Sequence, residues 1–210
     1  MKNYSDSNYS LEKCKDEYLA FLRSIKRDGM DKLISYLEKH GFFQAPASAG
    51  KNESREGGQL RHALNVMTRR IMNVGSQDVL ASEKVQNENA EKAAESIAIV
   101  ALLSGIWKAC YFRKTMRKVS KEDGTVEKIY GYGIRPAEDR LCYGRDDDHG
   151  DEAVYILQGF IRLSREEAFA IRSQSWDPHS DEARRVFLKH KLAFHYHIAE
   201  LQAIYLDEVD

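Results

Sequence analysis

The stretch AIVALLSGIWKACYF, residues 98–112, constrains the fold of this chain more than any other. It is the most apolar segment of a chain in which 31% of the residues are charged, so it belongs at the centre of the hydrophobic core. Ser104 and Gly105 stand in its middle. Serine competes for backbone hydrogen bonds, and glycine costs about 1 kcal/mol relative to alanine inside a helix. A buried helix gains nothing from this pair, and its presence needs a reason.

The composition limits the partners of the chain. Its 32 lysines and arginines nearly balance its 33 aspartates and glutamates, so no overall field draws it to nucleic acid or to an anionic membrane. Nucleic acid is therefore not an expected partner, and any site for a polyanion has to be local. At 210 residues the chain is long enough for one domain with a sizeable core.

Targeting features and cysteine usage indicate a cytoplasmic protein. The start MKNYSDSNYS is too polar for a signal peptide, and the run IAIVALL is too short to cross a bilayer, so no membrane partner is expected. The three cysteines, Cys14, Cys110 and Cys142, are far apart and have no CxxC spacing for zinc. Their odd number is unsuited to a disulfide framework and is typical of a reducing compartment.

Hydrophobic periodicity predicts a mostly α-helical chain with one β-hairpin. Residues 1–41 are expected to form helices that pack on a core of residues 42–210, within a single structural domain. Alternating charged and apolar residues around Asp123-Gly124 predict the hairpin over residues 111–134, and Ser164 with Glu167 matches a capping box. The expected helices cover 11–25, 30–41, 59–75, the apolar segment that contains the Ser-Gly pair, 151–163, 164–175 and 181–209.

Several histidines are candidate metal ligands because they lie near loop-to-helix junctions or on a helix that also carries Glu200. A metal site on helices needs nitrogen and oxygen ligands from several segments. The run of three aspartates at 146–148 also has oxygen ligands suited to magnesium or manganese. Each of these residues has a structural alternative, as a core histidine or as charge on a solvated loop. The candidate histidines are His62, His149, His195 and His197, of which the last two point to different helix faces.

Taken in order, six segments resemble bacterial and phage proteins of the HD-domain phosphohydrolase superfamily. The likeness covers about residues 42–208 and implies an HD-domain-like helical bundle with the β-hairpin as an insertion. It also implies a metal-activated water that hydrolyses phosphate esters, often those of nucleotides. The segments are FFQAPASAG, REGGQLRHALNV, ESIAIVALLSGIWKACYF, the hairpin, HGDEAVYILQGFIRLSREEAFAIR and HIAELQAIYLDE.

The resemblance implies positions for the metal ligands, and three of them keep a residue able to bind an ion. His62 matches the first histidine of the family pattern, and His149 matches a later one. Glu200 stands in place of the final aspartate.

The other ligand positions have changed. Ser104 and Gly105 stand where the family has its His-Asp pair, although the neighbouring Lys108 is kept. Gln174 replaces a further histidine. Serine is a weak metal ligand and glycine has no side chain, so most of the affinity for a divalent ion is expected to be lost. The resemblance thus implies a degenerate site, and it leaves open whether the chain is an enzyme.

The favoured function is a pseudoenzyme that binds a phosphorylated, nucleotide-like ligand in the old pocket. Its expected binding residues are Arg61, Lys108, Arg172 and Gln174, around the vestigial positions 104 and 105.

Two alternatives remain open. One is an active phosphohydrolase with a rebuilt site, in which His62, His149 and Glu200, with Asp147 or Asp148, hold one manganese, magnesium, iron or zinc ion. The other is an interaction protein that binds a protein partner and whose pocket is filled by Trp107, Trp176 and Gln174.

Overall fold

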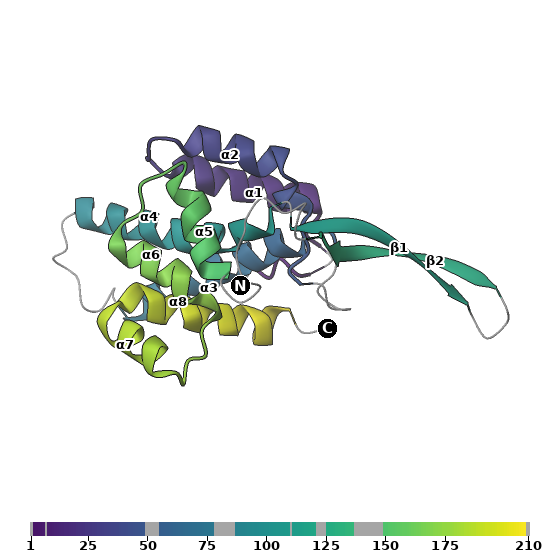
Figure 1. Ribbon diagram of the computed structural model, residues 1–210. Coiled ribbons are helices and arrows are strands. Elements are labelled where there is room, and N and C mark those ends of the chain that lie inside the picture. Colours follow the sequence, from purple (N-terminus) through teal and green to yellow (C-terminus); the bar gives the residue numbers. More distant parts are fainter. Residues whose placement is uncertain are drawn as a thin grey trace.

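The computed structural model describes residues 2–6, 8–48, 55–77, 87–109, 111–120, 125–136 and 149–208. They form a bundle of helices with one two-stranded antiparallel sheet that extends away from it (Figure 1). The α-helices are α1 (Leu11–Ser24), α2 (Met30–Lys39), α3 (Gly58–Gln77), α4 (Asn87–Leu103), α5 (His149–Gln158), α6 (Arg165–Arg172), α7 (Asp181–Lys189) and α8 (Lys191–Gln202). Shorter turns are η1 (Phe42–Gln44), η2 (Ser104–Lys108), η4 (Ser173–Ser175) and a π-helical turn, Ala203–Asp207.

The two N-terminal helices lie side by side against the rest of the bundle (Figure 1). Ser10 caps α1 by accepting a hydrogen bond from the backbone of Lys13. The buried Tyr18 of α1 donates a 2.6 Å hydrogen bond to the carbonyl of Leu102 in α4. Before α2, Gly29 has φ +91°, and a Cβ there would lie 1.9 Å from the carbonyl oxygen of Phe160. These contacts fix the first helices to the core.

One hydrophobic core runs through the bundle, from Tyr4 near the N-terminus to Ala203 after α8. The apolar segment of α4 lies at its centre, because Ile99, Leu102 and Leu103 are fully buried. Within the described residues, no helix has both the length and the apolar character needed to cross a bilayer.

The sequence suggested one helix through the Ser-Gly pair, but the apolar segment does not continue as a helix there. Helix α4 ends at Leu103, and Ser104 begins the tighter 3-10 turn η2. The pair therefore lies at a helix end, where serine and glycine are better tolerated than in a helix interior. Gly105 is also required by packing, because a Cβ there would lie 2.1 Å from the amide nitrogen of Gln59 on α3.

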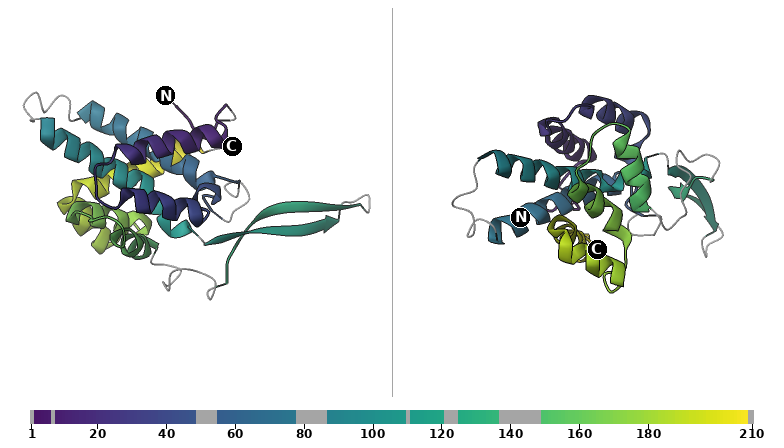
Figure 2. Two further views of the ribbon diagram at one scale, coloured as in Figure 1. Left: turned by 90° about the horizontal axis from the view of Figure 1, so that it is seen from above. Right: turned by 60° about the vertical axis from the view of Figure 1, so that its left-hand side comes forward.

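The hairpin consists of β1 (Phe112–Ser120) and β2 (Val126–Ile134), with Phe112 paired to Ile134 at its base. It projects away from the helices, and only its base is near the bundle (Figure 2). There Tyr111 and Phe112 pack with Ala45.

The long helix expected over residues 181–209 is interrupted in the structure. His190 has extended backbone angles and separates α7 from α8. Its Nδ1 lies 2.6 Å from a carboxylate oxygen of Glu166, and its ring stacks on Phe169 at 4.3 Å between centroids. These contacts with α6 hold the break in place, and the expectation of one continuous helix is wrong.

The predicted capping box is confirmed at the start of α6. Ser164 accepts from the backbone of Glu167, and the Glu167 carboxylate accepts from the backbone of Ser164. The same carboxylate is fully buried and receives two hydrogen bonds from Arg27, at 2.7 and 2.8 Å. Glu167 thereby links the start of α6 to the connection between α1 and α2.

Candidate functional site

A cavity of about 150 Å³ brings together side chains that are far apart in the sequence. They come from α3, η2, α5, η4 and α8. We call this cavity the polar pocket. The described residues that line it are Gln59, His62, Ser104, Gly105, Trp107, Lys108, His149, Gln174, Ser175, Tyr196 and Glu200.

Ser104 is held by two neighbours. Its hydroxyl lies 2.7 Å from the hydroxyl of Tyr196, and its carbonyl accepts a 3.1 Å hydrogen bond from the amide of Gln174. The Tyr196 hydroxyl also lies near the Glu200 carboxyl, one turn further along α8. The three polar side chains lie together at the polar pocket, with the hydroxyls of Ser104 and Tyr196 hydrogen-bonded to each other.

Gly105 makes room for a second polar contact. Without a Cβ at this position, the Gln59 amide lies against the backbone of η2. The Gln59 side-chain oxygen accepts a 2.5 Å hydrogen bond from Lys108 Nζ, which also donates to the carbonyl of Ala47 at 2.6 Å. These two acceptors fix the ammonium at the wall of the polar pocket.

His149 forms an aromatic wall of the polar pocket. Its ring stacks on the indole of Trp107, with centroids 3.6 Å apart and planes 3° apart, and Tyr111 meets the imidazole edge-on. Its Nδ1 is buried and lies 3.9 Å from a carboxylate oxygen of Glu152, too far for a hydrogen bond. The contacts of His149 are therefore mainly those of a stacking residue.

Glu200 has an unusual protonation equilibrium. Burial raises the pKa of its carboxyl to about 7, and the nearby Glu208 carboxylate adds to the rise. The positive charges of His62 and Lys108 and the hydrogen bond from Tyr196 oppose it. Near neutral pH the carboxyl is divided between its acid and its carboxylate, so it is able to donate or to accept a hydrogen bond.

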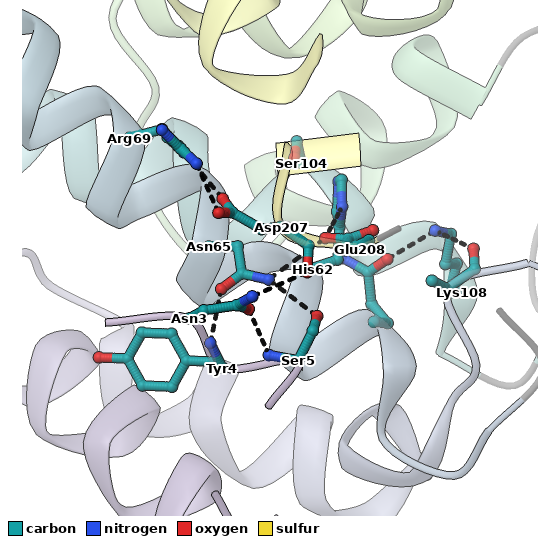
Figure 3. A network of polar contacts seen from close by, with 12 residues as sticks. Asn3, Tyr4, Ser5, His62, Asn65, Arg69, Ser104, Lys108, Asp207 and Glu208 are labelled. Atoms are coloured by element: carbon teal, nitrogen blue, oxygen red, sulfur yellow. Dashed lines mark hydrogen bonds and ion pairs between the residues drawn. The ribbon is translucent and has the colours of Figure 1, made fainter. Parts of the chain in front are cut away.

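His62 is bound to a carboxylate outside the lining of the polar pocket (Figure 3). Its Nδ1 lies 2.9 Å from an oxygen of Glu208, which also receives a 3.5 Å contact from Asn65. Burial tends to raise the pKa of Glu208, but the hydrogen bond and charge of His62, with smaller contributions from Asn65 and Lys108, hold it below its ordinary value. This carboxylate fixes the orientation of the His62 ring.

The same network ties the two ends of the chain to α3. Asn65 accepts from the backbone of Tyr4 at 2.8 Å and donates to Ser5, while Arg69 makes a two-pronged ion pair with the buried Asp207 (Figure 3). The segments before α1 and after α8 therefore pack against α3 and help to position His62.

Two expected binding residues lie outside the lining of the polar pocket. The guanidinium of Arg61 donates to the carbonyls of Tyr4 and Tyr9, at 2.6 and 2.7 Å, and so holds the N-terminal segment. Arg172 pairs with Asp151 at 2.6 Å on the surface. The structure does not bring these two arginines to the polar pocket, whereas it does place Lys108 and Gln174 there.

Of the tryptophans and C-terminal histidines that the sequence singled out, only one lines the polar pocket among the described residues. Trp107 lines the polar pocket, but Trp176 does not and lies under the guanidinium of Arg172. His197 packs against Phe187, and neither it nor His195 contributes to the described lining.

The described side chains fit a metal ion poorly. His62, His149 and Glu200 all line the polar pocket, yet in the part of the chain that the structure describes no three His, Cys, Asp or Glu side chains form a group able to hold a metal ion. Glu208 binds the ring nitrogen Nδ1 of His62, which leaves Nε2 as the nitrogen able to bind an ion. The aspartates at 147 and 148 lie outside the described residues. What the lining does provide is a mixed set of donors and acceptors, suited to hydrogen bonds with a polar ligand.

Sequence reasoning missed Gln59, Tyr196 and Glu208. Two of them carried a local signal, because Gln59 lies three residues before His62 and Tyr196 four residues before Glu200, each on the same helix face as its partner. Glu208 had no such signal, since 146 residues separate it from His62.

Comparison of the whole chain with protein-family models, with curated proteins and with solved structures gives no match.

Proposed function

We propose that this chain is a binding protein for a phosphorylated, nucleotide-like small molecule, and that it derives from an HD-type phosphohydrolase without retaining metal-dependent hydrolysis. The observation that supports the proposal best is the convergence of polar side chains from five elements on one cavity. Such convergent groups in a concave site are typical of ligand pockets. The sequence resemblance supplies the ligand class.

The size of the polar pocket limits how much of the ligand enters it. Pockets that enclose a whole small molecule start at about 300 Å³. At about 150 Å³, the polar pocket suits one polar group of a larger ligand. Lys108, Gln174, Tyr196 and Glu200 offer both donors and acceptors to that group.

The replaced ligand positions argue against turnover by the family mechanism. Gly105 presents no side chain, and the hydroxyl of Ser104 is occupied by Tyr196. Both positions now serve packing and hydrogen bonding within the protein.

Thermal unfolding with a panel of nucleosides and nucleotides, with and without a chelator, tests the proposal. A ligand at a hundred times its Kd adds roughly 2.7 kcal/mol to stability, which for a chain of this length corresponds to a Tm increase of about 5–10 °C. We expect a saturable increase that the chelator does not change. The absence of any shift across the panel would contradict the proposal.

A matched pair of variants locates the binding. Ser175 is an exposed residue on the rim of the polar pocket, so Ser175→Trp is expected to block it without disturbing the core. Ser35→Trp places the same side chain at an exposed position on α2, away from that lining. Ligand-induced stabilisation should be lost in the first variant and kept in the second; equal loss in both, or in neither, would place the ligand elsewhere.

Metal-dependent phosphohydrolysis is the second candidate, because His62, His149 and Glu200 line the same pocket. Metal analysis of the purified chain, with an assay of phosphate release in added manganese, separates it from the first. A stoichiometric metal together with manganese-dependent phosphate release would show that the chain is an enzyme and not only a binding protein. Metal below a tenth of an equivalent and no release would exclude this candidate.

A further inference from the structure

A second cavity of about 190 Å³ lies where the hairpin joins the bundle. Its walls come from the segment after α2, from η2 and from the bases of both strands. Four of its described lining residues are basic: Lys108, Arg113, Lys114 and Arg135. No aspartate or glutamate is among the described lining residues. We call it the basic cleft. In a chain of nearly zero net charge, this is a local concentration of positive charge of the kind that binds anions.

The hairpin fixes the geometry of the basic cleft. Arg135 Nε donates a 2.9 Å hydrogen bond to the carbonyl of Phe112, which orients the guanidinium beside the first strand. Lys114 and Tyr132 face each other in the register of the two strands. Lys114 is exposed and pairs with Glu56 at 3.1 Å, so the outer edge of the cleft is partly neutralised.

Tyr132 gives an independent indication of a ligand. Its hydroxyl is buried at the cleft and makes no hydrogen bond of good geometry with the described residues, although it lies close to Lys114. Burial raises the pKa of this phenol, which therefore remains a hydrogen-bond donor at neutral pH. A buried donor without a well-formed bond is rare, and an acceptor bound in the cleft would satisfy it.

Lys108 belongs to the linings of both the polar pocket and the basic cleft. Each cavity alone is smaller than the roughly 300 Å³ of a site for a whole small molecule, whereas the two together reach that size. Their charges differ, because the polar pocket contains the Glu200 carboxyl with the Glu208 carboxylate close behind it. A phosphate would meet carboxyl groups beside the cations in the polar pocket but no carboxyl group in the lining of the basic cleft, so the basic cleft is the more favourable site for it.

We propose that the basic cleft at the root of the hairpin binds the phosphate groups of a nucleoside phosphate whose uncharged end lies in the polar pocket, with Lys108 between them. The inference rests on the proposed function and adds an orientation to it. It assigns the hairpin a role in ligand binding through Arg113, Lys114 and Tyr132. The cationic side chains and the phenol supply charge-assisted hydrogen bonds to the phosphate oxygens.

Calorimetric titration of the full chain tests this orientation. The probes are the four ribonucleoside 5′-triphosphates, the corresponding nucleosides and inorganic pyrophosphate. Arg113→Glu reverses one exposed charge of the basic cleft, and Lys128→Glu reverses an exposed charge of the same hairpin outside the described lining. We expect Arg113→Glu to weaken binding of the preferred triphosphate at least tenfold, to leave the matching nucleoside within twofold, and Lys128→Glu to change neither.

Other results would overturn the inference in distinguishable ways. If Ser175→Trp abolishes triphosphate binding while Arg113→Glu leaves it unchanged, the proposed function stands and the orientation is wrong. If Arg113→Glu and Lys128→Glu weaken triphosphate binding equally, the effect comes from the overall charge of the hairpin and not from a site in the basic cleft. Pyrophosphate binding with no nucleoside contribution would make the cleft an independent anion site, and no binding of any probe would refute both proposals.

Discussion

The imidazole of His149 lies flat on the indole of Trp107, with ring centroids 3.6 Å apart and planes 3° apart. His149 begins α5 and Trp107 belongs to η2, so this stack joins two segments on either side of the hairpin. It also closes one side of the polar pocket. The position of the hairpin base is thus linked to the shape of the candidate site.

His149→Ala should destabilise the chain by about 1 kcal/mol beyond the loss of buried area, because a stacked aromatic pair contributes that much. It should also expose the Trp107 indole and shift its fluorescence to longer wavelength. The measurement is a urea unfolding curve followed by fluorescence, in a Trp176→Phe background that leaves Trp107 as the reporter. His179→Ala, in an exposed loop, is the control, and an emission spectrum in His149→Ala identical to that of the control would contradict the stacked arrangement.

Glu200 should make stability depend on pH in a defined direction. The pKa of its carboxyl is about 7 in the folded chain, above its ordinary value of 4.5. Between these values the folded chain holds a proton that the unfolded chain releases, so stability falls as pH rises through the window. The full penalty, on the order of 3 kcal/mol, is present above pH 7 and absent below about pH 4.5.

Glu200→Gln removes this titration and keeps the shape of the side chain. The variant should gain stability relative to the natural chain between pH 5 and pH 7.5, so that the difference between their free energies of unfolding, measured by urea unfolding at several pH values, rises in favour of the variant. Glu182→Gln, at an exposed position of α7, should give a constant difference over the same range. A constant difference for Glu200→Gln as well would show that its carboxyl is not perturbed.

Gly150 should not tolerate a side chain, because it packs against the backbone at the end of α6. A Cβ at this position would lie 2.2 Å from the carbonyl oxygen of Arg172 and 2.7 Å from its carbon. Gly150→Ala should cost about 1–3 kcal/mol through overpacking, which exceeds the gain of up to about 1 kcal/mol in helix propensity. Gly131→Ala, with nothing within 4 Å of the added Cβ, should stay within about 0.5 kcal/mol. Thermal unfolding compares them, and equal stabilities would refute the close approach.

The ion pair between Arg27 and Glu167 should be sensitive to the loss of one partner. The Glu167 side chain is fully buried, and removal of the guanidinium leaves its charge uncompensated except for Ser96 and the backbone of Ser164. Arg27→Met should therefore cost about 3–5 kcal/mol. Arg23→Met, at an exposed position of α1, should have little effect in the same urea unfolding experiment. A cost below 1 kcal/mol for Arg27→Met would mean that the carboxyl is protonated or solvated instead.

The sequence by itself determined the helical class and the hairpin. Helical periodicity located α1 and α2, strand alternation located the hairpin, and Ser164 with Glu167 identified the start of α6, because these signals depend only on near neighbours. Of the site residues expected from the sequence, His62, Ser104, Gly105, Lys108, His149, Gln174 and Glu200 line the polar pocket, whereas Arg61 and Arg172 do not.

Only the tertiary structure decided what those residues contact. Local pattern did not indicate that Gly105 packs against Gln59, that His190 breaks the last helix, or that Arg61 binds the N-terminal backbone. Each of these features depends on a group distant in sequence: Gln59 beside Gly105, Glu166 beside His190, and the carbonyls of Tyr4 and Tyr9 beside Arg61. Side-chain periodicity reports which face of an element is buried, but it carries no information about the polar group that meets that face across the core.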